Sequence, residues 1–175
     1  RIPVSIDRIP QHVRDAFVYI EDERFYEHAG VDWKRTFGAF LNELTHGMLY
    51  GSKQGGSTIT QQLVKNVTGD KEQNMDRKMR EIFRAADLEK YRTKDEILDA
   101  YLNCVGMGGS CSGVQAAALK YFGKDVSELD LAEAACLAAI PKSPESLNPF
   151  ANKEANRERQ LLVLKAMYNN AAISK

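Results

Sequence analysis

The sequence predicts a helical domain, on three observations. Apolar residues recur every three to four positions through most of the 175 residues, which is the period of an α-helix. Two capping boxes, Thr93 with Glu96 and Asp130 with Glu133, precede apolar segments and mark helix starts. Alternation typical of a β-strand is confined to a brief stretch near residues 4–6, and no internal repeat is found.

The expected helices follow one another from the N-terminus. Two stripes of spaced apolar residues predict helices over 10–26 and 32–48, namely Val13, Phe17, Ile20 and Phe25, and then Trp33, Phe37, Phe40, Leu41 and Leu44. Further helices are expected over 57–66, 72–91 and 112–122, after Thr93, from Asp130 to Pro141, and over 153–170.

Three segments interrupt this pattern. Gly47–Gly56 and Gly106–Gly113 are glycine-rich and are expected to form mobile loops, which often carry binding sites on a helical scaffold. Residues 141–150 contain three prolines, and a residue before proline is disfavoured in a helix. We therefore expect an extended connector there.

Composition narrows the classes of function. The chain has 24 Lys and Arg and 24 Asp and Glu, so its formal net charge is zero, which argues against a general nucleic-acid binder. The three cysteines include no C-x-x-C pair, so zinc is not expected. Free thiols are the simpler expectation, with a bridge between Cys104 and Cys111 left open.

The longest apolar run, Ala134–Ile140, is far shorter than the roughly 20 residues that span a bilayer. The chain begins at Arg1 without Met, and we expect anchors or partner domains beyond its ends.

The first candidate site is the acidic segment that starts at Glu21. On a helix, Glu21, Phe25 and His28 lie at positions i, i+4 and i+7 and share one face. Because Phe25 is apolar, this face is expected to point inward, where a carboxylate is suited to proton transfer. The alternative is an acidic, solvent-exposed face on which His28 only packs.

The second candidate is the helix start near Ser57. Gly55 and Gly56 lead into Ser57 and Thr58, and the free backbone N–H groups of such a start suit an anion such as phosphate. The segment is not a P-loop, because Ser57 stands where that motif requires Lys. An ordinary N-capped helix is the alternative.

The third candidate is a carboxylate among cations, where Glu81 stands beside Arg77, Lys78 and Arg80. Residues 65–94 hold nine Lys or Arg and six Asp or Glu, a local excess of 9 − 6 = +3 that indicates an anionic ligand. A salt-bridged exposed helix face is the alternative. Taken together, the three candidates suggest glycosyl transfer from a phosphate-linked sugar, in which one Glu takes the acceptor's proton and the cations hold the departing diphosphate.

Five blocks stand in order along the chain. They are Glu21-Asp22…Phe25…His28-Ala29-Gly30, Gly55-Gly56-Ser57-Thr58-Ile59-Thr60-Gln61-Gln62 with Lys65-Asn66, Arg77-Lys78…Glu81, Lys94…Ile97-Leu98…Tyr101-Leu102-Asn103, and Arg159 before Val163-Leu164. The blocks closely resemble the motifs of the family 51 glycosyltransferases, which are the peptidoglycan transglycosylase domains of class A penicillin-binding proteins and of monofunctional transglycosylases. Two departures are Gln160, where a second Arg is frequent, and the 104–113 loop, which lacks the aromatic residues often found there.

The resemblance implies an all-α, lysozyme-like fold over residues 1–175, with a large globular lobe and a small membrane-facing jaw near residues 34–70. The implied substrate is lipid II, a disaccharide-pentapeptide on undecaprenyl diphosphate. The implied reaction forms a β-1,4 link with inversion and releases undecaprenyl diphosphate at the extracytoplasmic face of the bacterial plasma membrane. Implied partners are the growing glycan strand, moenomycin-type inhibitors and a C-terminal transpeptidase domain in bifunctional members. Mg²⁺ or Mn²⁺ is an optional cofactor, since the sequence has no dedicated metal cage.

The resemblance also implies roles residue by residue. Glu21 is the expected base on the acceptor 4-hydroxyl, and Glu81 is the expected assisting carboxylate. The expected diphosphate ligands are Lys65, Arg77, Lys78 and Arg80. The remaining substrate-site residues are Ser57, Gln62, Asn66 and Arg159, together with Asp22 and His28, which hold the first motif in place. In the jaw, the apolar run Met48–Tyr50 is expected to enter the bilayer, unless it packs against the helix near Ser57.

Two other functions stay open from the residues alone. A lysozyme-like glycan hydrolase shares the fold and one catalytic Glu, but it needs no diphosphate clamp such as Lys65 and Arg77. A binding module for polyprenyl diphosphate or glycan would gain nothing from carboxylates such as Glu21 and Glu81 beside its anion.

Overall fold

The computed structural model describes residues 1–44, 56–69 and 74–174, and for residues 39–44 it describes the backbone alone. Within these ranges the chain forms helices and no β-strand. The α-helices are α1 (Gln11–Glu21), α2 (Trp33–Leu44), α3 (Ile59–Thr68), α4 (Met75–Tyr91), α5 (Lys94–Cys104), α6 (Val114–Phe122), α7 (Leu131–Ala138), α8 (Pro144–Leu147) and α9 (Lys153–Asn169). Two short 3-10 helices, η1 (Ile6–Arg8) and η2 (Val126–Glu128), complete the set.

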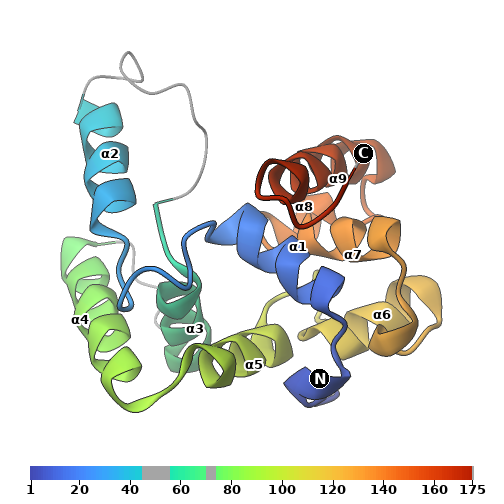
Figure 1. Ribbon diagram of the computed structural model, residues 1–175, viewed down its shortest axis with the longest axis horizontal. Helices are drawn as coiled ribbons and strands as arrows, with labels where there is room; N and C mark the ends of the chain where they lie inside the picture. Colours follow the sequence, from blue (N-terminus) through green and yellow to red (C-terminus); the bar gives the residue numbers. More distant parts are fainter. Residues whose placement is uncertain (45–55, 70–73, 175) are drawn as a thin grey trace.

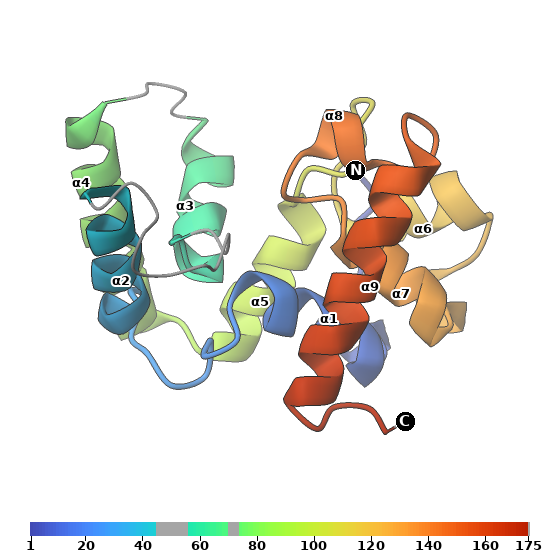
Figure 2. The same ribbon diagram turned by 90° about the horizontal axis from the view of Figure 1, so that it is seen from above.

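The helices are arranged in two groups joined by α5. Helices α2, α3 and α4 lie together at one end of the molecule, and α1 lies with α6 to α9 at the other (Figures 1 and 2). Helix α1 packs against α7 and α9, whereas α3 packs against α4 and α5. The expected jaw near residues 34–70 falls at the α2–α3 end. Its central part, residues 45–55, lies outside the described residues, and its role as a separate unit stays a prediction.

One apolar cluster joins the N-terminal and C-terminal halves of the chain. Phe17 of α1, Tyr101 of α5 and Leu137 of α7 are all fully buried members of it. Burial of each large side chain contributes about 1.5–3 kcal/mol. Packing in this core therefore fixes the positions of the end of α1 and the middle of α5.

Both expected capping boxes form. The Thr93 side chain accepts from the Glu96 backbone N–H, and Asp130 does the same for Glu133, with the reciprocal glutamate bonds also present. Each box satisfies backbone N–H groups that have no partner inside their own helix. The expected starts of α5 and α7 are thus confirmed.

Two sequence expectations on the helices are wrong. The helix expected over 10–26 ends at Glu21, because Asp22 turns the chain (φ −154°, ψ 72°) to bond elsewhere. The connector expected over 141–150 contains α8, which begins at Pro144, a position where the missing N–H of proline costs nothing. Residues 4–6, the one stretch with brief alternation, form no strand and lead into η1, in agreement with the helical prediction.

Three further expectations concern the glycine-rich segment 47–56, the cysteines and the absence of a membrane-spanning helix. The glycine-rich segment, with its apolar run Met48–Tyr50, lies outside the described residues apart from Gly56. Cys104, Cys111 and Cys136 are free thiols. Among the helices of the described ranges, none has the length and apolar character needed to cross a membrane.

Candidate active site

Glu21 lies on the wall of a cleft of about 730 Å³, where the two groups of helices meet. It is the last residue of α1. Several expected site residues share this cleft, namely Ser57, Gln62, Lys65, Asn66 and Arg159. The structure therefore brings together residues from the first, second and fifth sequence blocks.

The Glu21 carboxylate is held by two donors. Gln62 Nε2 donates to Glu21 Oε2 at 2.9 Å, and Arg159 Nη2 lies 3.4 Å from Glu21 Oε1. The side chains of Glu21 and Arg159 are 12% and 14% exposed, so the pair is largely shielded but borders the cleft. Both partners donate hydrogen bonds to the carboxylate oxygens, so they fix the position of Glu21 at the border of the cleft.

Asp22 and His28 lie behind this wall. Asp22 is fully buried, and its Oδ2 accepts from His28 Nε2 and from the Ile59 backbone N–H, each at 2.9 Å. Arg35 Nη1 lies 3.7 Å from Asp22 Oδ1. Asp22 thus ties the turn after Glu21 to the first residue of α3. The expected shared helix face of Glu21, Phe25 and His28 does not exist, because the helix ends before Phe25.

The start of α3 is fixed by its own cap. Thr58 and Gln61 form a capping box, and Thr58 Oγ1 donates to the Gly30 carbonyl at 2.7 Å. Gly30 packs so closely on α4 that a Cβ there would lie 2.4 Å from the Ala85 carbonyl oxygen. The first sequence block and α3 are therefore clamped together, and α3 in turn presents Gln62 and Lys65 to the cleft.

The second carboxylate, Glu81, is buried and forms a cluster of ion pairs with two partly exposed cations of α4. Arg77 Nη1 lies 2.6 Å from Glu81 Oε2, and Lys78 Nζ lies 2.5 Å from Glu81 Oε1. The Glu81 side chain is 5% exposed. Lys78 Nζ also donates to Ser57 Oγ at 2.8 Å, which connects the cluster to the cleft wall.

Lys65 is common to both parts of the site. It lines the large cleft and also borders a small cavity that Arg77 and Glu81 border from α4. Arg80, by contrast, is exposed, and it precedes Glu81 by a single position on α4. The structure thus places Arg77 and Lys78 in contact with Glu81, whereas it shows Arg80 only as an exposed residue of the same helix; the role of these cations as diphosphate ligands stays a prediction.

Sequence reasoning missed three cations that line the cleft. Arg35, Lys142 and Lys165 add positive charge to it, and nothing in their local pattern distinguishes them from other charged residues. Gly106 also lines the cleft, and it belongs to the glycine-rich loop in which the sequence indicates a binding site. The charge of the three cations gives the cleft an excess of cations over Glu21, which favours an anionic ligand.

The described residues contain no group of three or more His, Cys, Asp or Glu side chains placed to hold a metal ion. The polar groups of the cleft are mostly Lys, Arg and amide side chains. Their chemistry fits an anion directly, through charge-assisted hydrogen bonds.

Comparisons with known proteins show the family to which the chain belongs. A family model described as Transglycosylase matches residues 1–168. Penicillin-binding protein 1A of Clostridium tetani is 42% identical over 180 residues, covering 100% of this chain and 23% of the relative. Penicillin-binding protein 1A of Aquifex aeolicus is 44% identical over 174 residues, covering 99% and 24%.

A solved structure is similar as well. The crystal structure of penicillin-binding protein 1A from Haemophilus influenzae matches with a TM-score of 0.59 and 27% identity, covering 100% of this chain and 16% of that one. This likeness confirms the expected all-α fold. The chain spans less than a quarter of the length of these relatives. Because the family model covers nearly every residue, the chain belongs to the transglycosylase family.

Proposed function

We propose that this domain polymerises lipid II into glycan strands. The observation that carries the proposal is the pairing of one cleft carboxylate, Glu21, with a separate cluster of cations around Glu81, bridged by Lys65 and Ser57. A transfer from a sugar diphosphate needs both a proton acceptor and a stabiliser of the departing anion. The cleft holds Glu21 and Lys65, and the cluster around Glu81 adjoins it through Ser57 and Lys65.

Glu21 acts as the general base in this proposal. The acceptor 4-hydroxyl oxygen forms a bond to C1 of the donor sugar as its proton passes to the Glu21 carboxylate. The bond from C1 to the diphosphate oxygen breaks, and the electron pair leaves with undecaprenyl diphosphate. Attack opposite the leaving group converts an α-linked donor to a β-1,4 product by direct displacement.

The cations hold the diphosphate. Lys65 lines the cleft from α3. Arg77 and Lys78 lie on α4, outside the cleft lining, and both contact Glu81. Glu81 orients these two side chains before the donor arrives, which lowers the entropy cost of binding. Charge-assisted hydrogen bonds to phosphate then stabilise the charge that develops as the diphosphate departs. Ser57 and Asn66 line the donor side.

A divalent ion on the diphosphate remains an optional part of the proposal. Mg²⁺ binds substrate phosphates with few protein ligands, so Mg²⁺ or Mn²⁺ would screen charge on the donor. The roles proposed for Glu21 and for the cations do not depend on this ion.

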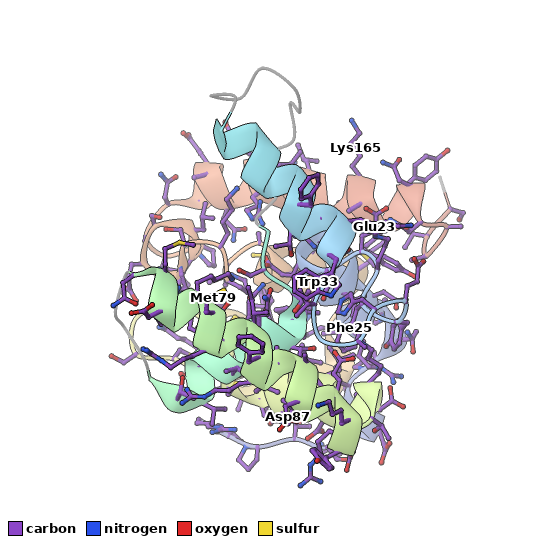
Figure 3. The ribbon with its side chains drawn as sticks, turned by 90° about the vertical axis from the view of Figure 1, so that its left-hand side faces the viewer. Glu23, Phe25, Trp33, Met79, Asp87 and Lys165 are labelled. Carbon is purple, nitrogen blue, oxygen red and sulfur yellow. The ribbon has the colours of Figure 1, made fainter. Side chains whose placement is uncertain are left out.

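The domain is proposed to work at the extracytoplasmic face of the plasma membrane, because the polyprenyl tail of lipid II stays in the bilayer. Large apolar side chains are exposed on α2 and α4, among them Trp33 at 65% and Met79 at 46%. Both lie on the face turned to the viewer in Figure 3. Such exposure suits contact with a bilayer surface. The longer relatives are consistent with a further domain, proposed to be a transpeptidase.

Incubation with lipid II tests the function. We expect glycan polymer and free undecaprenyl diphosphate to appear together, in proportion to the bonds formed. The hydrolase alternative predicts instead that purified glycan strands are shortened while lipid II is unchanged. A binding module would consume neither substrate.

A further inference from the structure

A buried tyrosine lies behind the Glu21 wall of the cleft. Tyr101, on α5, is the largest described side chain with essentially no exposure to solvent. Its ring packs in the apolar core, yet its hydroxyl donates to Gln62 Oε1 at 3.2 Å. A buried hydroxyl costs free energy unless it is hydrogen-bonded, so core packing alone would favour Phe at this position.

Gln62 connects this hydroxyl to Glu21. Its Oε1 accepts from Tyr101, and its Nε2 donates to Glu21 Oε2 at 2.9 Å. An amide can be turned by 180° with almost no change of shape, so its neighbours decide which end faces which partner. Glu21 offers acceptor oxygens and Tyr101 offers a proton, and only the observed orientation satisfies both.

We propose that Tyr101 is a positioning residue for Glu21, whose hydroxyl fixes the orientation of the Gln62 amide so that this amide holds the carboxylate toward the cleft. The inference rests on the proposed function in one respect, the role of Glu21 as base. It adds a residue, outside the cleft lining, that acts on the reaction through Gln62.

The protonation state of Tyr101 supports this role. Burial raises the pKa of Tyr101 well above its ordinary value, and the neighbouring Glu21 charge raises this pKa further. The hydroxyl therefore stays protonated, and stays a donor, across the pH range of any enzyme assay.

The test is a double-mutant cycle on lipid II polymerisation, with wild type, Tyr101→Phe, Gln62→Met and the double variant. Tyr101→Phe keeps the ring and removes only the donor. We expect kcat to fall about three- to tenfold, the effect of one hydrogen bond, and KM to stay within about twofold. In the Gln62→Met background, Tyr101→Phe is expected to have no further effect on kcat, because the amide that connects the Tyr101 hydroxyl to Glu21 is absent.

Tyr121→Phe is the matched control. Tyr121 on α6 donates its hydroxyl to the Met107 carbonyl, so this variant also loses one tyrosine hydrogen bond, but away from Glu21. We expect its kcat to stay within about twofold of wild type at a similar loss of stability.

A second readout does not depend on activity. The side-chain amide signals of Gln62 in a nitrogen–proton spectrum, identified by their loss in Gln62→Met, are expected to shift and exchange faster in Tyr101→Phe. An equal fall of kcat in both backgrounds, an unchanged kcat, or unchanged Gln62 amide signals would each overturn the inference. If wild type fails to polymerise lipid II, the proposed function falls, and the amide signals still decide whether Tyr101 positions Gln62.

Discussion

Replacing Asp22 with Asn is expected to destabilise the fold by removing one buried charge. Oδ2 of Asp22 accepts from His28 Nε2 and from the Ile59 N–H, both at 2.9 Å, and Oδ1 lies 3.7 Å from Arg35 Nη1. In Asp22→Asn the amide oxygen can take the place of Oδ2, but its NH₂ group then faces the Arg35 guanidinium. Hydrogen bonds to a charged group contribute about 1.5–3 kcal/mol and neutral ones about 0.5–1.5, so two weakened bonds cost about 2 kcal/mol.

The lost attraction to Arg35 brings the expected decrease in the free energy of unfolding to about 2–4 kcal/mol. For a domain of this size, that decrease corresponds to a fall of roughly 4–16 °C in Tm, measured by circular dichroism. Asp87→Asn is the matched control, since the Asp87 side chain is 63% exposed in a surface pair with Lys90 and its loss is expected to change Tm by less than about 2 °C. Equal Tm values for the Asp22 and Asp87 variants would refute the inference that Asp22 stabilises the fold by joining the end of α1 to the start of α3.

Three further predictions concern the diphosphate site, the packing of Gly30 and the membrane. Lys65→Ala and Arg77→Ala are each expected to weaken binding of moenomycin and lipid II by about 1.5–3 kcal/mol, measured by calorimetry; unchanged affinity in both would place the phosphate site elsewhere. Gly30→Ala is expected to lower Tm by several degrees, because Gly30 has φ +83° and its Cβ would collide with the Ala85 carbonyl; a wild-type Tm would show that the turn relaxes freely. Trp33→Ser is expected to reduce co-sedimentation with lipid vesicles, since Trp33 is exposed on α2; equal binding by variant and wild type would remove this face from membrane contact.

The sequence predicts most helices because their signals are local. The capping boxes at Thr93 and Asp130 lie within four residues of the helices that they begin, and both form as expected. The end of α1 was not predictable in this way. Asp22 leaves the helix to bond Ile59, which is 37 positions later, and no local pattern carries that information.

The candidate site, too, is predictable from the sequence only in part. Spacing and family resemblance indicate Glu21, Glu81 and Lys65, and the structure places Lys65 in the lining of the cleft with Glu21 and in the lining of the small cavity with Glu81. The contact between Glu21 and Arg159 spans 138 positions, and the contact between Tyr101 and Gln62 spans 39. Such pairs depend on how α1, α3, α5 and α9 pack, so only the folded chain shows which donors hold the carboxylate.

The most direct test of the central claim compares Glu21→Gln with Glu23→Gln in lipid II polymerisation. Glu23 lies two positions from Glu21, is exposed, and accepts a hydrogen bond from Asn170 at 3.0 Å. Loss of a general base costs about 10²–10⁴-fold in rate, so we predict that Glu21→Gln stays folded and loses turnover by at least about 10²-fold, whereas Glu23→Gln polymerises like wild type. Near-normal turnover by folded Glu21→Gln would contradict the account.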